Sequence, residues 1–370
     1  MTSANIYIGI MSGTSIDSVD VVAVTFHADR LNLLDTHSYP IPEGLRQSIL
    51  TLSQANGDTV QLYGETDAAL GILFAEATLA IMSKLSLTTD MIMAIGSHGQ
   101  TVRHQPPNDT ALGFSLQIGD ANIIAARTGC AVVTDFRRKD IALGGQGAPL
   151  VPAFHRELFT SPIQNRVIAN IGGIANISVL PANGRCSGFD TGPGNMLLDA
   201  WCQKNTDNAY DDNGKWSSRG CADNTLLNRL KAHSFISLQA PKSTGREDFN
   251  LSWLEQQLTG LSLTAEDIQA TLVMFTAQTM ADAIRHLDTD INEVYVCGGG
   301  AFNGQLMAKL RISLGDIRVQ STTELGLDPN WVEACAFAWL AKQRIDMQSG
   351  NLAAVTGASR RTVLGAVYLP

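Results

Sequence analysis

One arrangement occurs twice in this chain: an apolar run, a turn of small residues, and a second apolar run. The first copy covers residues 6–24 and the second covers residues 166–180. Each copy predicts two antiparallel strands joined by a tight turn, because Val and Ile fill the runs while Gly, Ser and Thr fill the turns. Two similar hairpins far apart in one sequence indicate a duplicated domain. This feature constrains the fold more than any other.

A third Gly-rich turn follows the apolar strand predicted at residues 293–297, and it consists of Gly298, Gly299 and Gly300. The turn of the second hairpin holds Gly172 and Gly173. Backbone N–H groups in such turns can form a concave nest for an anion. Three Gly turns, each preceded by an apolar strand, therefore indicate one ligand held between two similar halves.

Helical patterns alternate with these strands, which predicts an α/β protein. We expect helices near residues 66–85, 116–126, 196–203, 221–230, 264–287 and 331–345, and further strands near residues 91–95, 131–133 and 362–368. With 370 residues the chain is long enough for two domains. We expect domain I at residues 1–138 and domain II at residues 139–349, with residues 350–370 as a candidate return to domain I.

The composition excludes several classes of protein. A formal net charge of −9 argues against a nucleic-acid partner, which requires a concentrated basic surface. The six cysteines form no Cys-x-x-Cys pair, so neither a zinc cluster nor a disulfide framework is predicted. The first residues do not resemble a signal peptide, and no apolar run approaches membrane-spanning length. We expect a cytoplasmic protein with no membrane partner.

The turn of the first hairpin has the chemistry of a phosphate site. Gly13, Thr14 and Ser15 offer backbone N–H groups and hydroxyls without bulk, and Asp17 and Asp20 stand where a hydrated Mg²⁺ could bridge to a bound anion. The same residues are also typical of an ordinary hairpin turn. The common P-loop and dinucleotide signatures are absent from the sequence.

Asp190 is the candidate general base. It lies between Phe189 and a Gly-Pro-Gly turn, where partial burial would raise the pKa of its carboxyl. The alternative is a structural carboxylate that accepts hydrogen bonds from the amides of Thr191 and Gly192.

Polar side chains that follow the predicted strands form a second candidate group. His98, Gln100 and Thr101 offer hydrogen bonds to sugar hydroxyls or to a carboxylate. Asp120, Asp135 and Arg137 also follow strands or open helices, and helix capping or surface pairing would explain them as well. Glu333 lies in the first turn of the last predicted helix, where the helix dipole alone favours a carboxylate.

These residues occur within motifs that resemble the anhydro-N-acetylmuramic acid kinase family. The matching segments run through the chain in the order of that family and cover residues 11–20, 97–101, 117–120, 135–137, 144–149, 170–177 and 189–195. The resemblance implies a duplicated, two-domain fold of the actin, hexokinase and Hsp70 type (ribonuclease H-like), with ATP and the sugar in the interdomain cleft. It also implies a homodimer that acts in peptidoglycan recycling.

The resemblance assigns roles residue by residue. It implies that ATP, Mg²⁺ and water convert 1,6-anhydro-N-acetylmuramic acid to N-acetylmuramic acid 6-phosphate and ADP, with Asp190 as the catalytic base. It places the sugar pocket at Glu333 and the regions of His98 and Asp135. The ATP phosphates are expected at Gly13, Thr14, Ser15, Ile16, Asp17, Ser18, Val19 and Asp20, and the Gly turns of the second half, Gly172–Gly173 and Gly298–Gly300, are expected at the same nucleotide.

One residue departs from the family pattern: Ser18 stands where this loop usually has glycine. A side chain there could crowd the turn and weaken ATP binding. Two rival functions remain open on the sequence. A phosphohydrolase of the same superfold would release phosphate without a sugar, whereas an actin-like assembly protein would polymerise with ATP.

Overall fold

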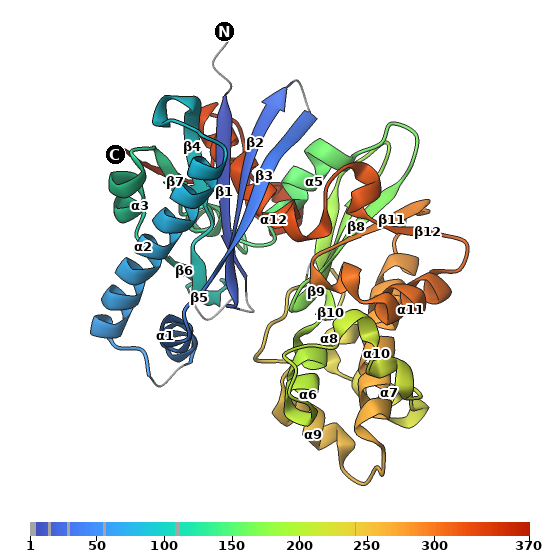
Figure 1. Cartoon of the computed structure of the whole chain (residues 1–370). Coiled ribbons are helices and arrows are strands. Elements are labelled where there is room, and N and C mark those ends of the chain that lie inside the picture. The colour runs from blue at the N-terminus through green and yellow to red at the C-terminus, as the bar shows by residue number, and fades with distance from the viewer. Residues whose placement is uncertain (1–4, 14–15, 28–29, 55–56, 108–111, 241) are drawn as a thin grey trace. The chain divides into compact units, whose positions relative to one another are not determined.

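The computed structural model describes residues 5–13, 16–27, 30–54, 57–107, 112–240 and 242–370, which form two compact units (Figure 1). The first unit consists of Met1–Leu158 and Trp331–Pro370, and the second unit is Phe159–Asn330. These boundaries differ from the expected ones at 138/139 and 349/350. The difference at the C-terminal side arises because α12 (Val332–Ile345) packs on strands of the first unit rather than on the second.

The first unit is built on a six-stranded sheet in the order β13-β7-β4-β1-β2-β3. The first three strands in sequence pair antiparallel, while β4 and β7 run parallel to β1 and β13 closes the edge antiparallel to β7. Their bounds are β1 (Ile6–Ser12), β2 (Ser18–His27), β3 (Arg30–Pro40), β4 (Ile92–Ser97), β7 (Val132–Thr134) and β13 (Ala366–Tyr368). Strand β13 thus brings the end of the chain into the first unit.

The second unit repeats this plan in a five-stranded sheet of order β10-β9-β8-β11-β12. Again three antiparallel strands precede two strands that run parallel to the first of them. The strands are β8 (Arg166–Ile171), β9 (Ile174–Leu180), β10 (Ser187–Pro193), β11 (Glu293–Cys297) and β12 (Arg318–Ser321). Apart from the added strand β13, the two sheets have the same strand order and directions, which confirms the predicted duplicated, ribonuclease H-like α/β fold.

Close backbone packing explains why α12 belongs to the first unit. Helix α12 contacts β1 and β4 (Figure 1). Gly9 and Gly96 in these strands leave room for it. A Cβ atom at Gly9 would lie 1.9 Å from the carbonyl oxygen of Ala334, and one at Gly96 would lie 2.1 Å from that of Phe337. Only glycine permits this approach of helix to sheet.

Helix α2 (Val60–Lys84) packs against α1 (Glu43–Ser53), α3 (Ala121–Thr128) and β2. By length and composition α2 could cross a membrane, which corrects the expectation that no apolar run reaches that length. More than half of its apolar window is buried, however, and Leu70, Phe74 and Ile81 are core residues. A core helix of this kind meets the same criteria. Three further helices of the first unit are α4 (Arg138–Ala142), α5 (Val151–Phe159) and α13 (Ala353–Thr356).

The core of the second unit lies between its sheet and a group of helices. Phe249, Phe275 and Trp253 form edge-to-face and tilted ring contacts within it, and such contacts stabilise an apolar core. The helices are α6 (Met196–Asn205), α7 (Asn224–Lys231), α8 (Ser234–Ser237), α9 (Leu251–Leu258), α10 (Ala265–Arg285) and α11 (Gly304–Leu314).

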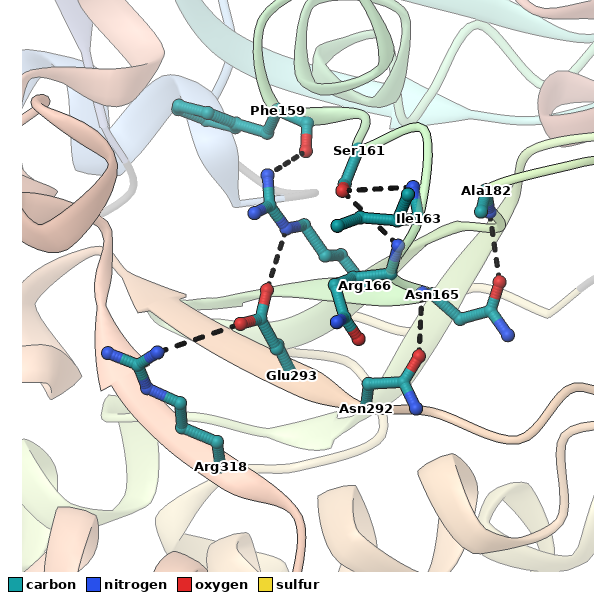
Figure 2. A network of polar contacts seen from close by, with 10 residues as sticks. Phe159, Ser161, Ile163, Asn165, Arg166, Ala182, Asn292, Glu293 and Arg318 are labelled. Atoms are coloured by element: carbon teal, nitrogen blue, oxygen red, sulfur yellow. Dashed lines mark hydrogen bonds and ion pairs between the residues drawn. The ribbon is translucent and has the colours of Figure 1, made fainter.

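Polar contacts fix the starts of the strands of the second sheet (Figure 2). The Arg166 guanidinium, at the start of β8, donates to the Glu293 carboxylate at the start of β11 with an N–O distance of 2.8 Å. Arg318, at the start of β12, lies 3.7 Å from the other oxygen of that carboxylate. Beside them, the Asn165 amide donates to the Asn292 side-chain oxygen at 2.9 Å. The network holds the parallel strands in register at the ends opposite to their Gly turns.

Candidate active site

The phosphate hairpin expected at residues 13–20 covers the turn after β1 and the first three residues of β2. Thr14 and Ser15 are outside the described residues. The Ile16 amide donates to the Gly13 carbonyl at 3.3 Å, and Ile16 has a φ of 55°, which is unfavourable for a β-branched residue. The side chains of Ile16 and Val19 are buried in the core of the first unit. These two positions can therefore offer a ligand only their main chain.

The carboxylates of this hairpin are held by hydroxyl and amide donors. One oxygen of Asp17 accepts from the Ser18 amide at 2.9 Å. Oδ1 of Asp20 accepts from the hydroxyls of Ser38 at 2.9 Å and Ser18 at 3.4 Å. Burial raises the pKa of Asp20, and the hydrogen bond from Ser38 opposes the rise. Ser18 opens β2 without a left-handed backbone, so its side chain introduces no backbone strain in the hairpin.

Asp17 and Asp20 fit the chemistry of a hydrated Mg²⁺ site. Mg²⁺ prefers oxygen ligands and usually keeps several waters, with one or two carboxylates and substrate phosphates completing its shell. Oδ2 of Asp20 accepts no hydrogen bond from the described residues. Among those residues no group of three or more His, Cys, Asp or Glu side chains could hold a metal by itself. The site thus fits an ion brought in by phosphates, not a dedicated metal cage.

The structure brings His98 and Arg137 together in the first unit. One guanidinium nitrogen of Arg137 lies 2.8 Å from Nε2 of His98, and the other terminal nitrogen donates to the Gly147 carbonyl at 2.9 Å. Because arginine only donates, Nε2 of His98 is the acceptor and its imidazole is neutral. Burial, assisted by the Arg137 charge, lowers the pKa of His98 well below its ordinary value. His98 therefore orients Arg137 and does not carry a second charge.

Glu333 provides the negative charge of this group. It lies in the first turn of α12, as the sequence predicted. Burial raises the pKa of its carboxyl while the Arg137 charge opposes the rise and Asp20 adds to it. No hydrogen bond or ion pair engages Glu333 among the described residues. The buried Nε of Arg137 and the buried hydroxyl of Ser97 likewise have no hydrogen-bond partner there. Buried polar atoms are normally satisfied, so this arrangement is suited to a polar ligand.

Gln100 and Thr101 are engaged within the protein. The Ser12 hydroxyl donates to the side-chain oxygen of Gln100 at 2.6 Å, and Gln100 in turn donates to the Thr101 carbonyl at 3.2 Å. The Thr101 hydroxyl accepts from the Gln117 amide at 3.0 Å. These bonds join the end of β1 to the two-stranded sheet of β5 (Gln100–Gln105) and β6 (Phe114–Ile118). Gln100 thus supports the loop that carries His98.

Asp120 and Asp135 lie in a different place from the His98–Arg137–Glu333 group. They line a polar pocket of about 280 Å³ in the first unit, together with Asp67 and Arg138. Asp120 caps α3 by accepting from the Asn122 amide at 2.8 Å. Asp135 forms a two-bond ion pair with Arg138 at 2.8 and 2.5 Å. Capping and pairing, the alternatives considered from the sequence, account for all these contacts of both aspartates.

Asp190 lies within β10, and the strand also includes Gly192 and Pro193, where the sequence predicted a Gly-Pro-Gly turn. Its Oδ2 accepts from the Thr244 amide at 3.0 Å, and neither Thr191 nor Gly192 donates to it. Burial raises the pKa of Asp190 to about 7, while the Thr244 hydrogen bond and the Lys242 charge oppose the rise. A carboxylate with that pKa can accept a proton near neutral pH. The alternative of a turn carboxylate held by its own neighbours is wrong.

The Gly turns of the second unit meet at the end of β8. The carbonyls of Gly172 and Gly173 accept from the amides of Asn195 at 2.7 Å and Gly194 at 2.9 Å. The Asn195 side chain donates to the Ile171 carbonyl at 3.1 Å. These bonds fix the hairpin turn against the start of α6, and a Cβ atom at Gly172 would meet nothing closer than 3.7 Å. This side of the turn thus has room for an added atom at ordinary contact distance.

Gly298 and Gly300 pack closely on the same strand end. Gly298 has a φ of 77°, and a Cβ atom there would lie 2.6 Å from the side-chain oxygen of Asn170. A Cβ atom at Gly300 would lie 2.4 Å from Ile171, whereas one at Gly299 would meet only Asn195, at 3.4 Å. The structure thus gathers all five predicted glycines of the second unit around the end of β8. This placement is compatible with a nucleotide site.

Sequence reasoning missed three residues of these groups: Lys242 and Thr244 beside Asp190, and Asp140 beside Arg137. Asp140 is fully buried and accepts from the Gly147 amide and from the side chains of Asn351 and Thr356. The sequence signal that could have identified Asp140 is its position three residues after Arg137. Residues 242–248 had none, because nothing in a polar loop shows which distant strand it will contact.

Known proteins match the chain from end to end. A model of the anhydro-N-acetylmuramic acid kinase family matches residues 5–370. The anhydro-N-acetylmuramic acid kinase of Shewanella loihica is 51% identical over 368 residues, which is 99% of this chain and 99% of that protein. The enzyme of the same name from Coxiella burnetii is 49% identical over 364 residues, covering 98% and 97%.

Among solved structures, the activator of the 2-hydroxyisocaproyl-CoA dehydratase from Clostridium difficile with bound ADPNP has a TM-score of 0.45 and 12% identity. The match covers 93% of this chain and 98% of that one. The family assignment depends on the end-to-end sequence matches. On these grounds the chain belongs to the anhydro-N-acetylmuramic acid kinase family.

Proposed function

We propose that this protein uses ATP and water to convert 1,6-anhydro-N-acetylmuramic acid to N-acetylmuramic acid 6-phosphate and ADP. The observation that carries the proposal is Asp190, a partly buried carboxylate whose pKa is raised to about 7, in a chain that matches this kinase family throughout. The reaction requires a base that is ionised near neutral pH to activate water. Asp190 meets that requirement.

The reaction explains why one carboxylate is sufficient. Asp190 takes a proton from the water that attacks C1 of the sugar, and the bond between C1 and O6 breaks. Hydrolysis of a glycoside normally also needs an acid to protonate the leaving oxygen. Here O6 stays on the same sugar and takes the γ-phosphoryl group, while the bond to the β-phosphate breaks and ADP leaves. The proton on Asp190 is then released to solvent.

The sugar is proposed to bind to the polar group of the first unit. Arg137 carries a buried positive charge, and its Nε, the Ser97 hydroxyl and the Glu333 carboxylate have hydrogen-bonding capacity for a ligand. The carboxylate of the sugar could pair with the Arg137 cation, and its hydroxyl groups could donate to the Glu333 carboxylate. Asp120 and Asp135, expected in the same pocket, are assigned to it only through the family resemblance.

The ATP phosphates are proposed to bind to the main chain of residues 13–20 and to the Gly turns at Gly172–Gly173 and Gly298–Gly300. Mg²⁺, held through water by Asp17 and Asp20, would supply charge neutralisation for the phosphates. The room for an added atom beside Gly172 supports this assignment. We also propose that the protein works as a homodimer in the cytoplasm, in peptidoglycan recycling, without a nucleic-acid or membrane partner.

The test is mass spectrometry of the products formed from ATP, Mg²⁺ and 1,6-anhydro-N-acetylmuramic acid in ¹⁸O-labelled water. The proposal predicts a 6-phosphorylated sugar with ¹⁸O at C1 and ADP in equal amount. Phosphate and ADP released beside an unchanged anhydrosugar would favour the phosphohydrolase. The absence of turnover, together with ATP-dependent sedimentation of the protein, would favour the assembly protein.

A further inference from the structure

We propose that Lys242 is a positioning residue for Asp190, and that the segment from Lys242 to Asp248 keeps this carboxylate in place and ionised as a base. The role of Lys242 in catalysis rests on the proposed function, whereas its effect on the ionisation of Asp190 does not. The family resemblance assigns no role to Lys242 or to Asp248. The inference comes from the contacts of this segment with β10 and α8.

Two main-chain groups of the segment form hydrogen bonds with Asp190. The Asp190 amide donates to the Lys242 carbonyl at 3.1 Å, and the Thr244 amide donates to Oδ2 of Asp190 at 3.0 Å. The Thr244 hydroxyl donates to Asp248 at 2.6 Å, which fixes the turn that presents this amide. The carboxylate is therefore oriented by a backbone donor, which loses no side-chain entropy when it forms the bond.

The Lys242 side chain is held in place independently of Asp190. Its ammonium donates to the carbonyls of Phe235 at 3.2 Å and Ile236 at 3.1 Å, near the end of α8. The same nitrogen lies 4.7 Å from the centre of the Phe235 ring, a cation–π distance. Carbonyls at the end of a helix and an aromatic face both stabilise a cation. The charge is thus fixed near Asp190 without a direct ion pair.

A fixed positive charge near Asp190 favours the ionised carboxylate, whereas burial disfavours it. Burial is the main cause of the raised pKa of Asp190, and the Lys242 charge lowers it. Burial also lowers the pKa of Lys242, and Asp190 opposes that change. Without the ammonium the Asp190 carboxyl would hold its proton to a higher pH, and a smaller fraction would be ionised at neutral pH.

The other elements packed around Asp190 bring few competing charges. Strand β9 places the uncharged Asn176 opposite Asp190, and α8 contains no ionisable side chain. Helix α10 approaches β10 near Thr279, and its Asp282 is paired with Lys231 and Arg285. The acidic first turn of α10 lies about 18 Å along the helix from Thr279. In the segment itself, Asp248 accepts from Thr244 and would raise, not lower, the pKa of Asp190.

Two substitutions separate the charge of Lys242 from its hydrogen bonds. Lys242→Gln keeps a donor for the carbonyls of Phe235 and Ile236 but removes the charge, whereas Lys242→Arg keeps the charge. The pKa of Asp190 would be read by ¹³C NMR of protein labelled in its aspartate carboxyls, with the Asp190 signal identified by its absence from Asp190→Asn. The acidic limb of kcat/KM against pH would be recorded for the same proteins.

We expect Lys242→Gln to raise the pKa of Asp190 by about 0.5 to 1 unit, and Lys242→Arg to leave it within about 0.2 unit. The limb of kcat/KM should move by the same amount in each variant. An unshifted NMR titration in Lys242→Gln would overturn the inference, whether or not the protein turns over this sugar. A shift in the NMR titration without sugar-dependent turnover would support the inference and contradict the proposed function instead.

Discussion

At the scale of single residues, burial moves the ionisable groups of this protein in opposite directions. It raises the pKa of Asp190 to about 7 and lowers that of His98 well below its usual range, because burial always disfavours the charged form. The result is a carboxylate that exchanges a proton near neutral pH and an imidazole that stays neutral. The first suits a base, and the second suits an acceptor that orients Arg137.

Replacement of the base tests this assignment directly. Asp190→Asn keeps the shape of the side chain and should keep ATP and sugar binding, but turnover should fall by about a hundredfold or more. In the wild type, kcat/KM should fall as the pH drops below about 7, because Asp190 takes up a proton there. Isothermal titration and initial rates would measure both effects.

A matched control for this substitution is Asp288→Asn. Asp288 is exposed and lies outside the groups described above. The turnover of Asp288→Asn should equal that of the wild type within about twofold. If Asp190→Asn retained near-normal turnover, another group would have to be the base.

At the scale of elements, the turns of the second unit show why glycine is required at some positions and not at others. Gly298 combines a φ of 77° with close contact to Asn170 and Ile171 at the end of β8. Gly299, next in the chain, has an ordinary φ and faces only Asn195. The turn between β11 and α11 thus requires glycine at position 298 for its backbone conformation and at position 300 for space, whereas residue 299 can vary.

This contrast gives a prediction for the turn. Gly298→Ala should lower the free energy of unfolding by about 1 to 3 kcal/mol, because its Cβ atom would clash and its backbone would be strained. Gly299→Ala should change it by less than about 0.5 kcal/mol. Urea unfolding would measure the free energy of unfolding of both variants. Equal values for the two would contradict this account of the turn.

At the scale of the whole molecule, the two units differ in how the chain builds them. The second unit is one continuous segment with its own core, whereas the first unit needs two segments. Helix α12 packs on β1 and β4, and Asn351 and Thr356 satisfy the buried carboxylate of Asp140. A buried carboxylate that loses such partners is costly. The first unit is therefore incomplete until the C-terminal segment is present.

Fragments of the chain should behave accordingly. Residues 159–330 expressed alone should unfold in one cooperative transition in urea, because their core is contained within the segment. Residues 1–158 alone should lack such a transition and should gain it when joined through a short linker to residues 331–370. Cooperative unfolding of residues 1–158 on their own would show that α12 is not needed for the fold of that unit.

Much of the fold could be predicted from the sequence because the signals were local. The hairpins at β1–β2 and β8–β9, the helices α2, α10 and α12, and the strand before Gly298 all follow from apolar spacing and turn residues. Strands β3, β5, β6, β10 and β12 were not predicted, and the helix expected from residue 116 begins only at Ala121, because residues 116–118 belong to β6. Strand β10 contains Asp190, two glycines and a proline, a composition typical of a turn, and its strand conformation comes from pairing with β9.

The sequence by itself determined the duplicated α/β plan, the family and the identity of Asp190, Arg137 and Glu333 as the side chains worth testing. Only the tertiary structure decided which of them meet. It joined His98 to Arg137 and placed Asp120 and Asp135 in a separate pocket. It also moved α12 into the first unit and brought Lys242 to Asp190. The physical reason is that spacing along a chain specifies a local conformation, whereas a pKa or an ion pair depends on groups that only folding brings together.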